Sequence, residues 1–217
     1  MKRAFTYIEL IAVVVIMGVL TAVAITYFGR QDTLTPATDQ IISHIRHTQH
    51  LAVMDDRFDY NKTSGEPTNY WTRYRWRIQF SDHDGWIYSI FADDEGRGNN
   101  SPSLGELAID PLNGTYLSGG GIPSLPKTHA DATPTMALKH YDINVAPNFS
   151  GCNGVQTITF DEIGRPYTIV AAPTAPAVVP QPIRLTSECK ITLTHDSGER
   201  AAICIAPESG YARACDP

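Results

Sequence analysis

An uncharged run near the N-terminus constrains the fold of this chain more than any other feature. The run Leu10–Phe28 carries no charge over 19 residues, and a helix of that length spans roughly 28 Å. This length is close to the hydrocarbon thickness of a bilayer, so the run predicts a transmembrane helix over residues 5–29. Lys2 and Arg3 precede the run, which predicts a cytoplasmic N-terminus and a remainder on the far side of the membrane.

Glu9 is the one charged residue between Phe5 and Phe28. A carboxylate inside an apolar helix costs about 2.5–3.5 kcal/mol near the bilayer centre and less near an end, so it usually serves a function with a partner. Phe5 lies four residues before Glu9 on the same helical face, so an amine freed by cleavage before Phe5 could neutralise the carboxylate. Two alternatives are a secretory signal peptide cleaved after Ala24 and an ordinary membrane anchor.

The segment after Gly29 predicts an amphipathic helix that continues the first helix to about residue 56. Apolar residues recur every three or four positions from Ile41 to Val53, after Thr38 as an N-cap candidate. Pro36 either kinks the path or sits in a first helical turn.

Three histidines, His44, His47 and His50, recur at every third position of this helix. Steps of 100° spread them over about 120° of the helix surface, whereas metal ligands must converge on one point. We therefore expect a solvated or partner-facing edge and no metal site at these positions.

From Trp71 onward the pattern is typical of strands. Arg73, Arg75 and Arg77 alternate with apolar residues, which predicts a half-buried strand whose arginines share one face. Such a stripe could bind a phosphate or an acidic partner, or it could be a solvent face with cross-strand carboxylates. Further strands are predicted at Trp86–Phe91, Tyr141–Val145, Val155–Phe160, Tyr167–Val170, Ile183–Leu185, Cys189–His195, Ala201–Ile205 and Tyr211–Cys215.

Two irregular loops are predicted at Leu117–Thr135 and Ala171–Pro182, which are rich in Gly, Ser, Pro and Thr or in Pro. The predicted fold class is α+β, with a long N-terminal transmembrane and amphipathic helix followed by a β-rich globular domain over residues 57–217.

The overall charge and the motifs exclude several classes of function. The 17 basic and 23 acidic residues give a net charge of −6, which argues against a generally basic nucleic-acid binder. The sequence contains no nucleophile elbow, phosphate-binding loop or paired catalytic carboxylates, so we do not expect an enzyme.

Four cysteines without a Cys-x-x-Cys pair predict two disulfides in an oxidising compartment. Cys204 and Cys215 flank the last turn and could pair, which leaves Cys152 with Cys189. The rival pairing joins Cys189 to Cys204 across the turn at Asp196-Ser197-Gly198.

The block Ala4-Phe5-Thr6-Tyr7-Ile8-Glu9-Leu10 resembles the leader of type IV pilins and type II secretion pseudopilins. The resemblance implies a leader of residues 1–4, cleavage between Ala4 and Phe5 by a prepilin peptidase, and N-methylation of Phe5. It also implies that Glu9 neutralises the new amine of a neighbouring subunit during assembly. The implied partners are other pilin subunits, the prepilin peptidase and an inner-membrane assembly platform, with the C-terminal domain in the periplasm.

Two later motifs are similar to the GspH/FimT group of minor pilins: Ile158–Pro166, with its Thr-Phe-Asp and Gly-Arg-Pro, and Ile203–Arg213. The expected function is a minor pilin or pseudopilin of a type II secretion pseudopilus or a type IV pilus. The resemblance also suggests an alternative, DNA uptake through a C-terminal Gly-Arg-x-Arg. Only its second arginine, Arg213, is present, because Tyr211 occupies the first position.

The stretch from Asp93 to Asn100 offers oxygen ligands between glycines, and Asp93, Glu95 and Asn99 are candidate calcium ligands. An acidic surface turn is the alternative, and no other cofactor is expected. Asn61 fits an extended bacterial glycosylation sequon.

Overall fold

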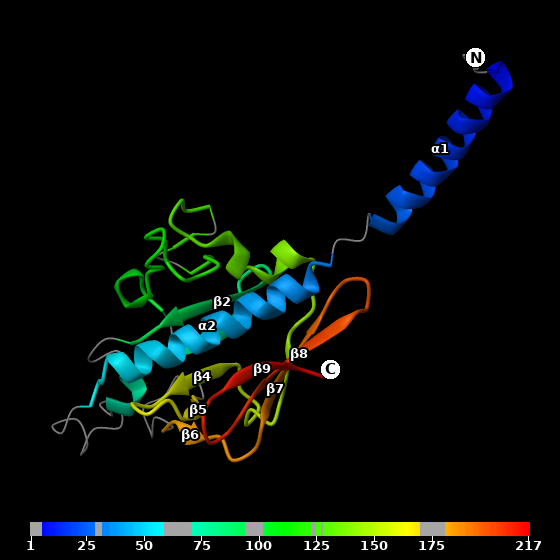
Figure 1. Ribbon diagram of the computed structural model, residues 1–217. Helices are drawn as coiled ribbons and strands as arrows, with labels where there is room; N and C mark the ends of the chain where they lie inside the picture. The colour runs from blue at the N-terminus through cyan, green and yellow to red at the C-terminus, as the bar shows by residue number, and fades with distance from the viewer. Residues whose placement is uncertain are drawn as a thin grey trace. The chain divides into compact units, whose positions relative to one another are not determined.

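The computed structural model describes residues 6–28, 32–58, 71–93, 102–122, 125–126, 128–169 and 181–217, and of residues 23–28 it describes the backbone alone. The chain divides into two units, Met1–Thr33 and Leu34–Pro217. Helix α1, Tyr7–Phe28, belongs to the first unit. Helix α2, Leu34–Met54, and the strands belong to the second unit (Figure 1).

The prediction of one long N-terminal helix that crosses a membrane is wrong. Two separate helices, α1 and α2, take its place. In the part of the chain that the structure describes, no helix is both long and apolar enough to span a bilayer.

The second unit contains two antiparallel sheets. The first sheet has five strands in the order β2-β1-β4-β5-β6 and the second has four in the order β3-β7-β8-β9. The strands of the first sheet are β1 Arg77–Asp82, β2 Trp86–Phe91, β4 Thr157–Phe160, β5 Pro166–Thr168 and β6 Ile183–Arg184. The strands of the second sheet are β3 Asn148–Ser150, β7 Cys189–Thr194, β8 Arg200–Ile205 and β9 Ala212–Cys215.

Helix α2 packs against strands of both sheets, namely β1 and β4 of the first and β8 and β9 of the second. Its apolar stripe enters the main core, where Ile41 and Ile45 are almost completely buried. Pro36 lies in the first turn, where a missing N–H costs nothing. Thr38 is inside the helix and not at its cap, and its hydroxyl donates to the carbonyl oxygen of Leu34 at 2.8 Å.

A smaller core lies beneath the segment between β2 and β3. It consists of Phe91, Leu107, Ile122, Leu125 and Ala132. Within this segment, Leu117–Thr135 was predicted to be an irregular loop, and its described part contains isolated β-bridges and the start of a short 3₁₀ helix, η4 Pro134–Met136. Two further 3₁₀ helices lie on either side of the predicted loop, η3 Leu104–Glu106 and η5 Leu138–Tyr141. A fourth 3₁₀ helix, η2 Trp71–Tyr74, precedes β1.

Three strand predictions differ from the structure. The strand predicted from Trp71 begins only at Arg77, because η2 occupies the preceding turn. The strand predicted at Tyr141–Val145 does not form, because Asp142 adopts a left-handed conformation (φ 55°) that ends η5. Strand β3 was not predicted, since its three residues, Asn148–Ser150, are too few to show alternation.

Candidate functional sites

Helix α1 presents an apolar surface on every side. The described side chains from Thr6 to Ala22 are all exposed. The large apolar ones among them, from Tyr7 to Leu20, have exposed fractions between 45% and 80%. A helix that is apolar all round normally packs inside a larger assembly.

Glu9 lies in the first turn of α1 and is exposed. Its carboxylate oxygen Oε2 accepts a hydrogen bond from the Thr6 hydroxyl at 3.4 Å. The two predicted processing residues, Ala4 and Phe5, lie outside the described residues, as does the sequon at Asn61.

The predicted arginine stripe does not reach solvent. Arg73 and Arg77 are completely buried and Arg75 is 9% exposed. Arg77 Nη1 lies 3.2 Å from the buried Asp93 Oδ2, and Arg77 Nη2 donates to the carbonyl oxygen of Arg73. Burial lowers the pKa of Arg77 to about 10, which Asp93 opposes, so the guanidinium stays charged near neutral pH. Arg73, Arg77 and Asp93 therefore form a buried charge cluster.

Arg75 is held separately, between two aromatic rings. Its guanidinium carbon is 4.5 Å from the ring centroid of Trp71 and 5.1 Å from that of Tyr167, and Nη2 donates to Glu162 at 3.0 Å. The two cation–π contacts and the ion pair with Glu162 hold the guanidinium in place.

The calcium prediction is not supported at the one ligand that the structure describes. Asp93 is buried and engaged with Arg77, while Glu95 and Asn99 lie outside the described residues. Within the described ranges, no three His, Cys, Asp or Glu side chains are arranged to hold a metal ion.

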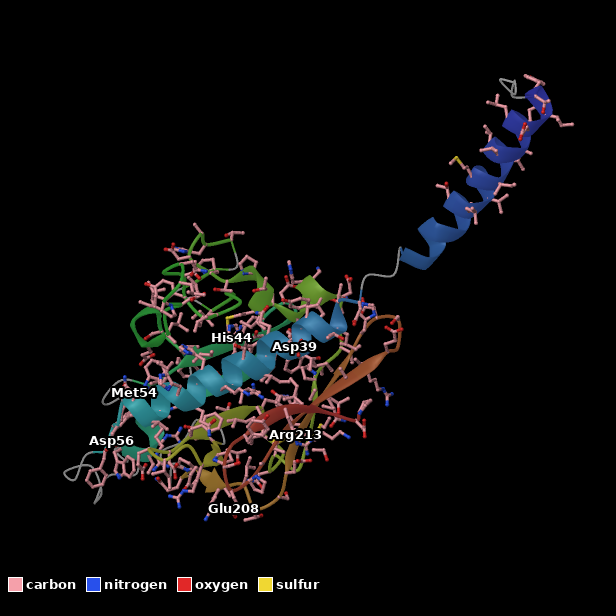
Figure 2. All side chains as sticks on the ribbon, in the orientation of Figure 1. Asp39, His44, Met54, Asp56, Glu208 and Arg213 are labelled. Carbon is pink, nitrogen blue, oxygen red and sulfur yellow. A yellow bond between two sulfur atoms is a disulfide. The ribbon has the colours of Figure 1, made fainter. Side chains whose placement is uncertain are left out.

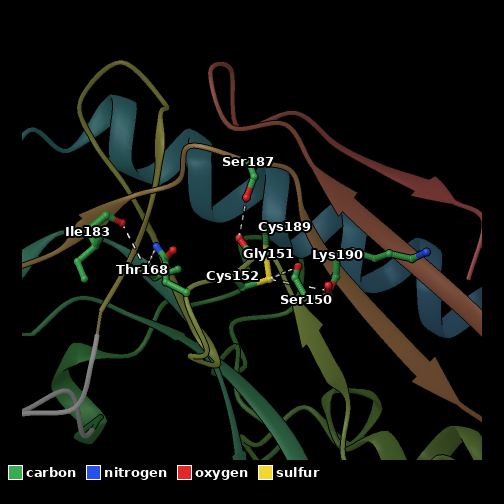
Figure 3. The surroundings of a disulfide bond; sticks show 9 residues. Ser150, Gly151, Cys152, Thr168, Ile183, Ser187, Cys189 and Lys190 are labelled. Carbon is green, nitrogen blue, oxygen red and sulfur yellow. Dashed lines mark hydrogen bonds between the residues drawn. A yellow bond between two sulfur atoms is a disulfide. The ribbon is translucent and has the colours of Figure 1, made fainter.

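Both disulfides follow the first of the two predicted pairings, and the rival pairing of Cys189 with Cys204 does not form. Cys152 is bonded to Cys189 at the start of β7, and Figure 3 shows this bond beside Ser187 and Ser150. Cys204 is bonded to Cys215 across β8 and β9. Disulfides persist in oxidising compartments, which places this domain outside the cytoplasm.

Arg213 lies on β9 beside the exposed face of α2, where Figure 2 labels it below Asp39. Arg213 Nη2 donates to Glu188 at 2.8 Å, and both side chains are nearly half exposed. Arg46, from α2, stacks over the ring of Tyr211 at 5.0 Å and donates from Nη2 to the carbonyl oxygen of Ala212 at 2.8 Å. Arg46 and Arg213 line a common open groove of about 520 Å³.

The two motifs that resemble minor pilins meet at Gln49 of α2. Its Nε2 donates to the carbonyl oxygens of Gly164 at 2.8 Å and Ser209 at 2.7 Å. Gly210 has φ +67°, and a Cβ there would lie 2.4 Å from the Gly164 oxygen, so only glycine fits this close approach.

Asp161 orders the first of these motifs. Burial opposes its ionisation, but hydrogen bonds from the side chain and backbone N–H of Arg165 and from the backbone N–H of Ile163 outweigh burial, so the pKa of Asp161 is lowered. The carboxylate therefore closes a turn, which is a structural role.

The three histidines of α2 lie in different surroundings. His44 is largely buried and its Nδ1 lies 2.8 Å from the hydroxyl oxygen of Tyr88, while His50 is exposed. His44 and His47 line a cavity of about 230 Å³ together with Asp110. No local pattern indicated this cavity, because Asp110 is distant from the two histidines in the chain.

Comparison with family models, curated proteins and solved structures finds no match to the chain. The resemblance to pilins therefore depends on the sequence motifs.

Proposed function

We propose that the protein is a minor subunit of a pilin-like filament, either a type II secretion pseudopilus or a type IV pilus, and that it assembles through α1. The observation that carries the proposal is the exposed, uniformly apolar surface of α1 with one carboxylate, Glu9, in its first turn. The β-rich second unit would face outward and select partners.

The apolar surface of α1 supports contact with like helices. Fully burying one Val, Leu or Ile side chain stabilises an assembly by about 1.5–3 kcal/mol, and α1 exposes many of them. Association of this kind requires helix-to-helix packing between subunits and does not require α1 to cross a bilayer.

Glu9 supports a specific register of this packing. A carboxylate that enters an apolar helix bundle must be paired, because an unpaired buried charge is strongly destabilising. Cleavage between Ala4 and Phe5 by a prepilin peptidase would supply the N-terminal amine of a neighbouring subunit as the partner of Glu9. The two disulfides agree with assembly outside the cytoplasm.

Replacing Glu9 tests the proposal in the native host. We expect Glu9→Gln to reduce the sheared filament fraction at least about tenfold while the total amount of folded protein is unchanged, since one buried charge pair is lost. The control is Glu199→Gln, because Glu199 is an exposed residue of the turn between β7 and β8. Immunoblots of sheared and cell-bound fractions measure the amount of filament and the total amount of protein for each variant.

N-terminal sequencing of the mature protein is the second arm of this test. A mature chain that begins at N-methylated Phe5 supports the proposal. A chain that begins after Ala24 would instead identify a secreted protein with a cleaved signal peptide, and filament levels in Glu9→Gln equal to wild type would contradict the role of Glu9.

DNA uptake is a second candidate, and one contact favours it. Tyr211 occupies the position of the missing arginine, but Arg46 stacks over that tyrosine ring and lines a groove with Arg213. Two guanidinium groups beside one groove could pair with two phosphates. Glu188 and Asp39 lie nearby and oppose this binding.

Anisotropy of a labelled duplex DNA tests this candidate with the double variant Arg46→Gln and Arg213→Gln. We expect weaker binding and a salt slope smaller by about 2, since each lost phosphate contact removes roughly one unit. Arg200→Gln is the matched control, because Arg200 is exposed and lies outside the groove. Equal binding by the double variant and the wild type would exclude this groove as the DNA site.

A further inference from the structure

A cavity of about 230 Å³ lies between α2 and the segment that follows β2. Ser43, His44 and His47 line it from α2, where Figure 2 labels His44. Asp110, Pro111, Leu112 and Leu117 line it from the other side. Asp110 carries the one carboxylate of this lining, and Leu112 is 93% exposed.

A directed hydrogen-bond chain orients the ring of His44. Gln40 Nε2 donates to the carbonyl oxygen of Thr135 at 3.1 Å, which identifies the nitrogen end of the amide, and the same nitrogen donates to Tyr88 Oη at 3.0 Å. The hydroxyl oxygen of Tyr141 donates to Gln40 Oε1. Tyr88 accepts from Gln40, so it donates its own proton to His44 Nδ1 at 2.8 Å.

His44 Nδ1 is therefore an acceptor, and the neutral ring carries its proton on Nε2. Burial, followed by the neighbouring His47, lowers the pKa of His44 to about 4, although Asp110 opposes this shift. Because Nε2 keeps its proton, it is not available as a metal ligand.

His47 contributes a buried atom that lacks a partner. Its Nε2 is shielded from solvent, and no described residue lies within hydrogen-bonding distance of it. Burial, followed by the neighbouring His50, lowers the pKa of His47, which Asp110 opposes, so this ring is also neutral near pH 7. The neutral ring therefore places no positive charge beside the cavity.

Asp110 faces these rings without forming an ion pair with either. Its Oδ1 accepts the backbone N–H of Leu112 at 2.9 Å, which leaves Oδ2 for another donor. The cavity thus combines one carboxylate, two neutral imidazoles and an apolar wall of Leu112 and Leu117.

We propose that this cavity binds a cationic group on an aliphatic stem, such as the side chain of a lysine presented by a partner protein. The ammonium group donates to Asp110 Oδ2, and the stem lies against Leu112 and Leu117. This proposal is independent of filament assembly, because all the residues that it uses belong to the second unit.

The test uses the full chain and two probes, Nα-acetyl-lysine N-methylamide and its uncharged analogue Nα-acetyl-norleucine N-methylamide. We expect saturable shifts of the His44 and His47 ring resonances with the lysine probe at about pH 7.5. Binding should weaken at lower pH, because a proton gained by the His47 ring would repel the ammonium group. The norleucine probe should bind at least about tenfold more weakly, since it lacks the charge-assisted hydrogen bonds.

Two variants separate the carboxylate from general effects of charge. Asp110→Asn keeps the oxygen that accepts the Leu112 N–H. It should weaken binding of the lysine probe about tenfold, because the carboxylate charge is lost. Asp131→Asn is the matched control, because Asp131 is exposed in the same segment and pairs with His129 outside the cavity. A second variant, Leu112→Ser, removes the apolar wall and should weaken binding about threefold without a change of charge.

Equal binding of both probes, or undiminished binding to Asp110→Asn, would overturn the proposal. No shift up to about 50 mM probe would also overturn it, because the cavity would then hold solvent only. Cadaverine distinguishes the source of the cation. Tighter binding of the blocked lysine assigns a protein side chain as proposed, whereas tighter binding of cadaverine assigns a free diamine and overturns the protein partner.

Discussion

The two helices of this chain are nearly equal in length but differ in how they bury apolar surface. Helix α1 has 22 residues and helix α2 has 21. The described apolar side chains of α1 are exposed on all sides. In α2 the apolar residues form one stripe, and the buried residues of the helix are Leu34, Ala37, Thr38, Ile41, Ile42, Ile45, Thr48 and Ala52.

Under the proposed function, this difference separates folding from assembly within one chain. A helix with one apolar stripe finds its partner in the sheets of the same chain, and it contributes to the stability of that chain. A helix that is apolar all round cannot satisfy its surface by packing one side. Substitutions in α2 should therefore change the free energy of unfolding, and substitutions in α1 should change association.

The largest expected difference comes from one isoleucine in each helix. Ile45 of α2 is completely buried, and Ile45→Ala should lower the free energy of unfolding by roughly 2–5 kcal/mol, because it leaves a cavity. Ile16 of α1 is 58% exposed, and Ile16→Ala should change that free energy by less than about 0.5 kcal/mol.

Chemical denaturation of the full chain, followed by tryptophan fluorescence, measures both variants. Trp71, Trp76 and Trp86 all lie in the second unit, so the signal reports the unit that contains α2. Equal losses of stability in Ile16→Ala and Ile45→Ala would show that α1 packs in the folded monomer, contrary to the comparison.

The next effect is a pH dependence that belongs to α2, since α1 contains no histidine. His44 has an ordinary pKa of 6.5 when unfolded and about 4 when folded, because burial and then His47 disfavour its charged form. Between these two pKa values the folded state binds fewer protons than the unfolded state. The free energy of unfolding is therefore highest above about pH 6.5 and falls towards pH 4 by on the order of 3 kcal/mol.

Denaturation midpoints between pH 7 and pH 4 check this expectation against His44→Gln. Glutamine offers an acceptor to Tyr88 but does not titrate, so the variant should show a shallower fall. His129→Gln, at an exposed position, should follow the wild type. A fall in His44→Gln as steep as in the wild type would assign the pH dependence to other groups, of which His47 is the nearest.

Local sequence patterns predicted those elements whose cause is local. The apolar stripe of α2 and the run of aromatic and β-branched residues in Trp86–Phe91 each contain their own signal, and both elements form. The arginine alternation at residues 73–77 carried a local signal that was wrong. Burial of Arg77 depends on Asp93, sixteen positions later, and on the ring of Phe91 at 5.2 Å, neither of which alternation reveals.

The candidate sites show the same limit. The motif around Glu9 is visible in the sequence, because its spacing of four residues lies within one helical turn. The chain of Gln40, Tyr88 and His44 joins α2 to β2 across more than forty positions, and Asp110 reaches the same cavity from a third segment. A site of this kind depends on the packing of separate elements and has no contiguous pattern.

The smallest expected effect compares one polar side chain from each helix. Gln49 of α2 bridges two distant carbonyl oxygens, and Gln49→Ala leaves both without this donor, so it should cost roughly 1–2 kcal/mol of unfolding free energy. Thr21 of α1 donates within its own helix to the carbonyl oxygen of Met17 at 2.7 Å. Thr21→Ala should therefore leave the fluorescence-detected midpoint unchanged. If Gln49→Ala also left the midpoint unchanged, packing of the apolar stripe alone would hold α2 against the two sheets.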